Sequence, residues 1–582
     1  MNCRSRSGSA RGPLGDGESR SRGQRVRVAL GVALAVSVVL VALAAGTAGV
    51  AAADPAAGSV HDGSTSTNDR SGSPLDGENG TVELVVRFDP VDDPAALGAT
   101  EGVPATGANA SATVADLRDH AAAEQAAFES FAASRTGVSV EREFWLANAL
   151  LVTVDAGRVT GTDLRAVENV SRIHENVVIE PIGETAEPIG ETAGRSADAT
   201  ANPQLGADPS GRAVAGVREI GAPTAWGEFD TRGAGATVAV VDTGVDPSHR
   251  DIDLAGWASF DENGTLVSDD VADASDPDGH GTHVAGTVAG GNASGTYVGV
   301  APEATLYGID AFEENGTATF AGVVASMEHA TTAADADVLQ LSLGANGTFR
   351  GFVGPVRNAR ATGTVVVAAV GNEGANASSS PANAYDAVAV GAVDESRRVP
   401  PFSGGQRINA SDAFGEHPDD WPATYVVPDV TAPGVRIASA AAGTRESYVF
   451  RQGTSMAAPH VSGVAALAVA ATDGRVAAPA IEAALVDTAV HPENATAPDS
   501  RYGHGVVDAP AAVEAAVEAT PPASEATERN GTATNATDGA SGDGPVGERG
   551  VTDDGAPGFG APAAVVAVAL AGLTAVARAR TE

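Results

Sequence analysis

The apolar pattern of the first third of the chain predicts a small α+β unit at residues 81–181. Alternating apolar and polar residues predict three strands, at residues 82–88, 148–155 and 177–181. Helical spacing predicts two helices, at residues 113–134 and 164–170. A helix therefore lies between the second and third predicted strands.

The central region, residues 209–518, has a different pattern. Runs of apolar β-branched residues alternate there with Ala/Gly-rich helical stretches. This alternation favours an α/β domain in which helices cover both faces of a parallel sheet.

Polar, low-complexity sequence surrounds these two regions. Residues 54–80 and 519–556 have a composition that cannot bury a core, so we expect disorder there. Residues 182–208 form a linker. The stretch from Pro181 to Ala193 contains the hexapeptide PIGETA twice. The repeat is read either as an exposed cleavage site or as the product of replication slippage.

The first 53 residues have the layout of a signal segment. Arginines precede an apolar run from Val28 to about Val50, and three alanines before Asp54 suit a cleavage site. Adjacent arginines are absent from this region, which favours general secretion over twin-arginine export. An uncleaved anchor is the alternative.

The net charge of the chain argues against one class of binding partner. The chain has 35 Lys+Arg against 75 Asp+Glu, a formal net charge of −40, which argues against nucleic-acid binding. Lysine is absent, and the dispersed acidity suits a protein adapted to high salt, with an ordinary acidic secreted protein as the alternative. Cys3 is the only cysteine, so no intrachain disulfide and no cysteine metal site can form.

Four short patterns in the central region supply the parts of an acyl-transfer site. VAVVDTG ends a buried strand in Asp242, and DGHGTHVAG places His280 at the start of a helix. An imidazole that a carboxylate orients can act as a general base. GTSMAAPHVSG places Ser455 where an apolar helix begins, and AVGNEG offers the amide of Asn372 as an oxyanion donor.

In these motifs and in their order the chain resembles the subtilases, the subtilisin-like serine proteases, and in particular the halolysin-like enzymes of halophilic archaea. The resemblance implies a three-layer α/β/α fold and a serine endopeptidase that acts through an acyl-enzyme. It implies Asp242, His280 and Ser455 as catalytic residues and Asn372 in the oxyanion hole. It also assigns peptide binding to the backbone of three residues: Ser342, Leu343 and Gly344.

The resemblance extends to partners and cofactors. No cofactor is needed for catalysis; structural calcium is expected from the family, but its ligands are unknown. The unit at 81–181 resembles an I9-type propeptide, which assists folding and then inhibits the enzyme. Substrates are polypeptides, and a monomer is expected.

The C-terminal residues 557–582 resemble the PGF-type sorting signal that an archaeosortase processes, with a simple transmembrane helix as the alternative. Either reading attaches an exported enzyme to the outer face of the cell membrane. Asn-x-Ser/Thr sequons such as Asn263, Asn315 and Asn530 suit an exterior protein, although which of them carry glycans stays open.

The two alternatives to a serine peptidase are a metalloprotease and a surface binding module without activity. His283 and His460 also lie in the catalytic motifs, and we expect both to pack in the core. A metalloprotease is disfavoured because the chain has no H-E-x-x-H string. A surface binding module that keeps the scaffold without activity is the remaining rival, and the intact serine motif counts against it.

Overall fold

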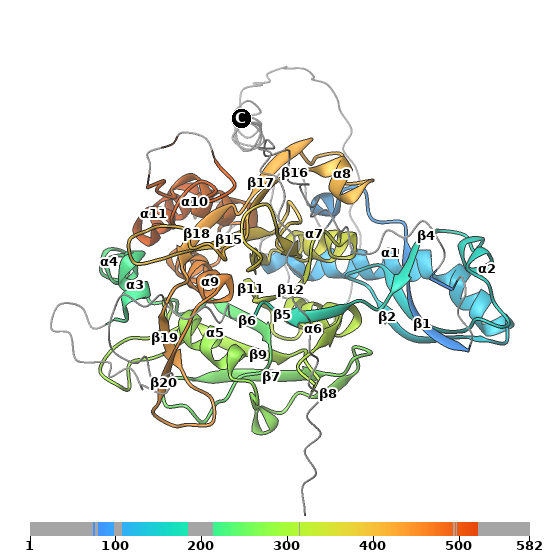
Figure 1. Ribbon diagram of the computed structural model, residues 1–582, viewed down its shortest axis with the longest axis horizontal. Coiled ribbons are helices and arrows are strands. Elements are labelled where there is room, and N and C mark those ends of the chain that lie inside the picture. The colour runs from blue at the N-terminus through green and yellow to red at the C-terminus, as the bar shows by residue number, and fades with distance from the viewer. Residues whose placement is uncertain are drawn as a thin grey trace, which may run out of the picture. The chain divides into compact units, whose positions relative to one another are not determined.

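An eight-stranded sheet organises the central region (Figure 1). The computed structural model describes residues 74–75, 80–97, 107–183, 213–313, 315–492, 495 and 498–521. From one edge to the other the strands are β18 (Val430–Pro433), β15 (Val388–Val393), β13 (Val365–Ala369), β11 (Val338–Leu341), β6 (Thr237–Asp242), β9 (Thr305–Asp310), β7 (Leu254–Phe260) and β8 (Leu266–Ser268). All of these pairings are parallel except β7 with β8.

Helices cover both faces of this sheet. One face packs against α3 (Ala215–Glu219), α4 (Ala222–Phe229), α5 (His280–Ala289), α9 (Thr454–Ala471), α10 (Ala478–Asp487) and α11 (Ala509–Ala519). The other packs against α6 (Phe320–Thr332) and α7 (Val353–Ala361). Strand β6 shows the division, because Val238 and Val240 join the first core while Ala239 and Val241 join the second. The expected three-layer α/β/α fold is confirmed.

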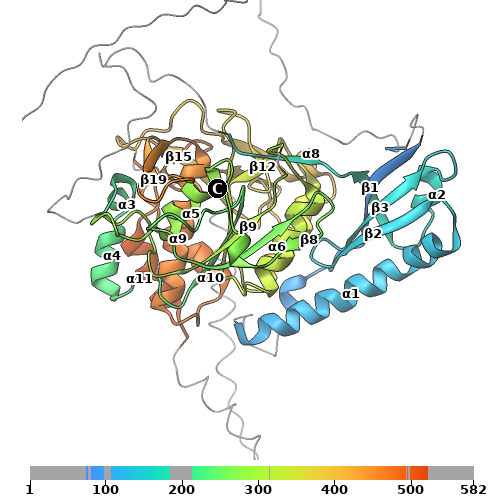
Figure 2. The ribbon, with the colours of Figure 1, turned by 90° about the horizontal axis from the view of Figure 1, so that it is seen from below.

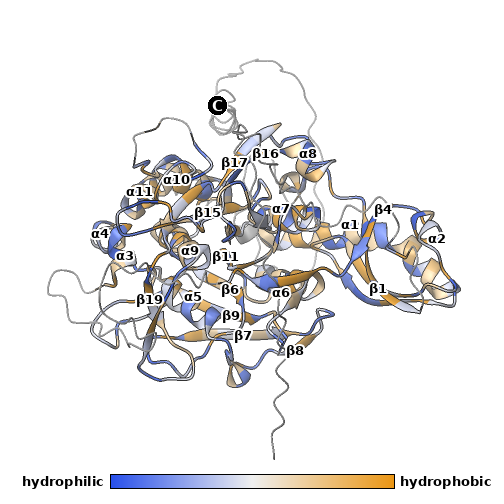
Figure 3. Cartoon of the chain, viewed as in Figure 1, coloured by the Kyte–Doolittle hydropathy of each residue, from blue (hydrophilic) through white to orange (hydrophobic). Residues whose placement is uncertain are grey.

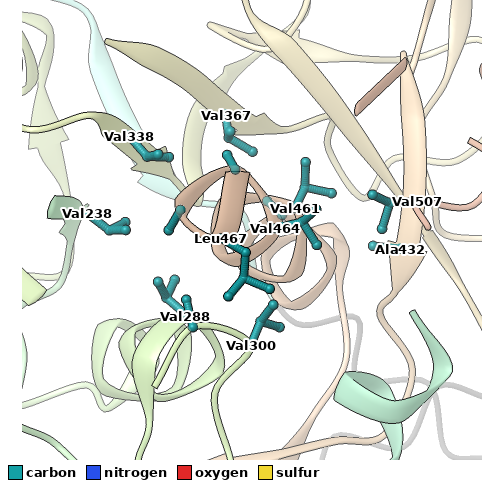
Figure 4. Packing of buried hydrophobic residues seen from close by; sticks show 14 of the residues in the cluster. Val238, Val288, Val300, Val338, Val367, Ala432, Val461, Val464, Leu467 and Val507 are labelled. Carbon is teal, nitrogen blue, oxygen red and sulfur yellow. The ribbon is translucent and has the colours of Figure 1, made fainter. Parts of the chain in front are cut away.

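The central helix of the first core is α9. Figure 4 shows its Val461, Val464 and Leu467 packed between residues of the strands and those near α5. Among the described residues α9 is the one helix long and apolar enough to cross a membrane, but 89% of it is buried, as a core helix should be. The hydropathy colouring in Figure 3 shows apolar residues gathered on the strands of the large sheet and polar ones along the outer loops.

Short elements in the connecting loops complete the central region. Two short hairpins are β16 (Gln406–Asn409) with β17 (Thr424–Val427), and β19 (Ile437–Ala440) with β20 (Tyr448–Arg451). The other short elements are β10 (Ala318–Thr319), β12 (Leu343–Asn346), β14 (Ser379–Ser380), α8 (Ala410–Phe414), η2 (Val271–Asp273) and η3 (Arg350–Phe352).

Residues 80–175, which we call the N-terminal unit, form a separate antiparallel sheet. Its strand order is β2 (Val138–Phe144), β3 (Ala149–Asp155), β1 (Thr81–Phe88), β4 (Val170–Glu175). Three helices accompany it: η1 (Pro94–Ala96), α1 (Gly107–Ser134) and α2 (Gly161–Arg165). Figure 2 shows α1 running along one face of the sheet, where its Phe128 shares a core with Leu84 and Val86. On the other face, Val85 and Leu151 share a core with residues of α6 and α7.

Three features of the N-terminal unit differ from the sequence-based prediction. The helix predicted at 164–170 is the shorter α2, because Asn169 has a left-handed φ of 66° and the chain turns there into β4. Strand β2 was not predicted, since its Ser139, Glu141 and Glu143 are exposed and weaken the apolar signal. Helix α1 begins six residues before the predicted start, at Gly107.

The strand predicted at 177–181 forms, as β5 (Val178–Pro181), but it belongs to a different sheet. It lies between β10 and β12 of the central region, antiparallel to both. The chain therefore leaves the N-terminal unit after β4. Its next strand, β5, pairs with β10 and β12, near the carboxyl ends of β11 and β13.

Candidate active site

Asp242 and His280 form a buried pair at the carboxyl ends of the parallel strands. Asp242 is the last residue of β6 and His280 the first of α5, and the two residues are 1% and 2% exposed. His280 Nδ1 lies 2.7 Å from Asp242 Oδ1, and the Thr243 N–H donates to the same oxygen at 2.8 Å. With a proton on Nδ1, the nitrogen left to act as a base is Nε2, which has no hydrogen-bond partner among the described residues.

The surroundings of His280 favour the protonated ring over the neutral one. Burial by itself disfavours the imidazolium, but the charge of Asp242 and its hydrogen bond outweigh burial, so the pKa of His280 is raised above its ordinary value. A raised pKa makes the imidazole a stronger proton acceptor.

Ser455 lies in the first turn of α9 and is fully buried. Its hydroxyl donates to the carbonyl oxygen of Ile182 at 2.8 Å, and the Ser342 carbonyl lies at 3.3 Å. In this state the hydroxyl does not donate to His280, whose Nε2 is unpaired. The structure thus joins Asp242 to His280, and it places Ser455 against a peptide carbonyl of the chain itself.

Asn372 presents its amide to the same stretch of chain. Its Oδ1 accepts hydrogen bonds from the Thr454 backbone N–H at 2.9 Å and from the Thr454 hydroxyl at 3.0 Å. These two donors fix which end of the amide is the oxygen, so that Nδ2 donates elsewhere. Nδ2 donates to the Gly183 carbonyl oxygen at 2.5 Å, one residue beyond the carbonyl that Ser455 contacts.

The backbone of the three residues predicted to bind peptide contacts residues 180–182 of the chain itself. Leu343 and Gly344 pair with Pro181 and Glu180 in the β12–β5 ladder, and the Ile182 N–H donates to the Ser342 carbonyl at 3.0 Å. Strand addition of this kind is a recurring mode of peptide recognition.

Ile179 of β5 and Ile182, the residue that follows β5, are both buried in the central region. Ile182 is 6% exposed and joins the core of α5 and α9, while Ile179 is fully buried in the core of α6 and α7. Val178, which precedes Ile179 on the side of the N-terminal unit, is 56% exposed. We call the place between β10 and β12 that residues 178–183 occupy the groove, and it takes up the apolar side chains at these two positions.

Comparison with known proteins agrees with this geometry. The sequence profile of the Subtilase family (Peptidase_S8) matches residues 233–505. The chain is 34% identical over 289 residues to subtilisin DY of Bacillus licheniformis, which covers 49% of this chain and 92% of that protein. It is 37% identical over 256 residues to a subtilisin of Bacillus pumilus, covering 43% of this chain and 82% of the relative. The chain belongs to the subtilase family.

Other subtilases of the comparison are matched over less of their length. Subtilisin E of Bacillus subtilis (strain 168) is also 37% identical over 256 residues, 43% of this chain, and the chain spans 60% of that relative. The chain likewise spans 60% of the length of several other curated subtilisins that it matches.

The subtilase site also depends on residues that the sequence motifs did not single out. Gln340 and Ser462 are fully buried, and the Ser462 hydroxyl donates to Gln340 Oε1 at 2.5 Å. The Gln340 side-chain amide donates to the Ser342 hydroxyl at 2.8 Å, and this hydroxyl donates to the Ser455 carbonyl oxygen at 2.9 Å. This chain of polar groups ties β11 to the first turns of α9. The sequence signal was a lone Gln within an apolar strand, which is otherwise a poor position for a polar residue.

The other two histidines of the motifs pack in the core, as expected. His283 Nε2 lies 2.9 Å from the Ile437 carbonyl oxygen, and His460 Nδ1 lies 2.8 Å from that of Met456. Burial lowers the pKa of His283 to about 3 and that of His460 to about 4, so both rings are neutral.

Within the described residues, no three His, Cys, Asp or Glu side chains are grouped so that they could hold a metal ion. The ligands of the expected structural calcium stay unassigned.

Proposed function

We propose that this subtilase is an exported serine endopeptidase that hydrolyses peptide bonds of extracellular proteins. The observation that supports this best is the buried Asp242–His280 pair, beside a groove in which the Ser455 hydroxyl lies 2.8 Å from a peptide carbonyl oxygen. The subtilisins matched by the chain, named as such, support the same reaction class.

The chemistry follows from the positions of these groups. Ser455 Oγ attacks the carbonyl carbon while His280 Nε2 takes the hydroxyl proton, and Asp242 keeps the imidazole oriented and stabilises its positive charge. The oxyanion that forms accepts hydrogen bonds from Asn372 Nδ2 and from the Ser455 N–H, in the first turn of α9 where helical N–H groups lack intrahelical partners. His280 then gives its proton to the leaving amine, and water releases the acyl group by the reverse steps.

The test is the variant Ser455→Ala, assayed on casein in high salt. It removes one hydroxyl and should abolish nearly all turnover while the protein stays folded. A parent-like rate from this variant would contradict the proposal. Failure of the parent protein to react with a fluorophosphonate probe would instead support a binding module that lacks activity.

We extend the proposal to self-processing, with the N-terminal unit as an I9-like propeptide. Residues 178–183 occupy the groove as a substrate would, and the carbonyl that Ser455 contacts belongs to Ile182. The bond so presented is Ile182–Gly183. It lies at the start of the predicted linker, so the released propeptide would keep β5 in the groove and inhibit the enzyme.

Mass spectrometry of the mature protein tests the position of this cleavage. Cleavage after Ile182 gives a chain that begins at Gly183. Because Asn372 contacts the next carbonyl, cleavage after Gly183 is the competing outcome, and a chain beginning at Glu184 would show it. The second copy of PIGETA lies outside the described residues, and a second N-terminus at Gly190 would show that it too is cut.

The remaining parts of the proposal rest on sequence alone. The signal segment at 1–53, the stalk at 519–556 and the sorting segment at 557–582 lie outside the described residues, apart from residues 519–521 at the start of the stalk. On that basis we propose passage through the export machinery, processing by an archaeosortase and attachment to the outer face of the cell membrane, in a monomeric enzyme of a high-salt organism. Deletion of residues 557–582 should then release activity from washed cells into the medium.

A further inference from the structure

One carboxylate outside the proposed catalytic set connects the two loops that carry Asp242 and His280. Asp276 lies four residues before His280 and is 7% exposed. Its Oδ1 accepts the Thr243 hydroxyl at 2.9 Å and the Gly279 N–H at 2.8 Å. Its Oδ2 accepts the Thr282 N–H at 2.7 Å and the Thr282 hydroxyl at 2.6 Å.

Each of the two threonines is bonded to both loops. The Thr243 hydroxyl accepts the Gly281 N–H at 3.0 Å, so this residue after β6 holds the first turn of α5. In the opposite sense, the Thr282 hydroxyl of α5 accepts the Asp246 N–H of the β6 loop at 2.9 Å. Asp276 accepts a hydrogen bond from both hydroxyls and thereby fixes which way each of them donates.

The network ends on the catalytic carboxylate. Thr243 donates through its backbone N–H to Asp242 Oδ1, the oxygen that also contacts His280. Rotation or displacement of Thr243 would therefore move the hydrogen bond that orients Asp242.

Two glycines allow the loops to lie close enough for these bonds. A Cβ on Gly281 would lie 2.0 Å from the Gly244 carbonyl oxygen and 3.1 Å from Asp242 Cβ. Gly244 has a φ of 105°, and a Cβ there would lie 2.1 Å from the Ser275 carbonyl oxygen. The backbones of the two loops thus touch at both glycines.

From this arrangement we infer that Asp276, acting through Thr243, is a positioning residue for the Asp242–His280 pair. It touches neither the bound strand nor Ser455 in the contacts described above; it sets the separation and orientation of the two loops. The inference rests on the proposed peptidase activity, since it assigns a role within that reaction.

The variants Asp276→Asn and Thr243→Val test it in the full-length protein, assayed on a fluorogenic peptide. Asparagine brings an NH2 group against donors, and valine keeps the shape of threonine without its hydroxyl. Because small displacements of reacting groups are costly, each should lower kcat by about 10- to 100-fold with KM within about 2-fold of the parent. Fluorophosphonate labelling of Ser455 should slow by the same factor.

Three comparisons separate positioning from a structural role. Thr243→Ser keeps the hydroxyl and should recover kcat to within about 3-fold of the parent. The double variant should lose no more than the worse single one, since both changes break one network. Asp337→Asn alters a half-buried carboxylate that accepts the Thr237 N–H at 2.8 Å, at the opposite end of β6, and should leave kcat unchanged.

The outcomes are distinguishable from those of the proposed function. If the parent itself is inactive and unlabelled, the proposed function fails. If the parent is active but folded Asp276→Asn keeps parent kcat, or Thr243→Ser is as slow as Thr243→Val, the positioning role fails. If Asp276→Asn does not fold, the threonine pair decides the question alone.

Discussion

Glu328 on α6 accepts the backbone N–H of Leu146, from the turn that joins β2 to β3, at 2.9 Å. The carboxyl is 7% exposed and lies where the N-terminal unit packs on the central region. Burial raises its pKa to about 7, against the hydrogen bond from Leu146 and the charges of Arg142 and Arg118. Packing of the N-terminal unit is therefore coupled to the protonation of one carboxyl group.

Glu328→Gln should remove a pH-dependent loss of stability from the inactive Ser455→Ala precursor. A carboxyl whose pKa rises from 4.5 to about 7 on folding stabilises fully below 4.5, and this contribution is lost as the pH rises towards 7. The loss is at most about 1.4 kcal/mol per pH unit over that window. Glutamine keeps an acceptor oxygen without a charge, so the variant should be more stable than the parent in urea unfolding at pH 8.

The matched control is Glu303→Gln, because Glu303 is a half-exposed residue paired with Arg232 at the surface. It should leave the pH dependence of unfolding unchanged. If Glu328→Gln and the parent have equal unfolding free energies at pH 8, burial does not raise the pKa of Glu328.

His174 should give the opposite pH dependence. Its ring lies between Phe320 and Phe349, at centroid distances of 5.3 and 5.2 Å, and burial followed by the charge of Arg87 lowers its pKa to about 3. A histidine that is neutral when folded and titrates at 6.5 when unfolded makes the precursor less stable as the pH falls from 6.5 towards 3.

His174→Asn removes this group and should flatten the acid side of the stability profile in the same precursor. His120 is only partly buried, and His120→Gln is the control that should leave the profile unchanged. Between pH 4.5 and 6.5 the Glu328 and His174 effects oppose each other, so the slope due to Glu328 should become visible only in the His174→Asn variant. A profile that is the same with and without His174 would contradict the assignment.

Much of the fold could be predicted from the sequence because its signals are local. The strands of the central sheet are buried on both faces, which gives continuous apolar runs such as Val365–Ala369. By contrast β2, with alternate residues exposed, carries a weak signal, and nothing local reveals that β5 pairs with β10 and β12 instead of with β4. Pairing partners depend on the tertiary arrangement, which periodicity does not contain.

The site was predictable in its parts but not in its present state. Motifs located Asp242, His280, Asn372 and Ser455, and the structure places all four at one edge of the sheet. The Ser455 hydroxyl contacts Ile182 and not His280, a contact that no motif predicts. The motifs gave no sign of the hydrogen bonds of Asp276, because an aspartate in a Gly/Asp-rich loop looks like an ordinary surface residue.

Asn372→Ala should lower kcat with little effect on KM, since the amide binds the oxyanion more strongly than the neutral carbonyl. Losing one such donor costs about 10²- to 10³-fold in kcat, a range established on subtilisin itself and so carried over to this relative. Asn409→Ala is a fitting control, because Asn409 caps α8 through Asp412 and its loss should cost about 1 kcal/mol of stability while kcat stays unchanged. Equal kcat values for Asn372→Ala and the parent would rule out the oxyanion role.

Ile182→Asp should block self-processing in the otherwise unaltered precursor. The Ile182 side chain is 6% exposed among apolar residues, and an unpaired carboxylate in that environment is strongly disfavoured, so the scissile bond would leave its place beside Ser455. The control Val178→Asp places the same charge four residues earlier, at the start of β5, where the side chain is 56% exposed. Processing should continue in this variant. Gel analysis of the precursor over time separates the two. If both variants are processed at the parent rate, the position taken by Ile182 does not select the cleaved bond; if both are blocked, the added charge and not the buried pocket is responsible.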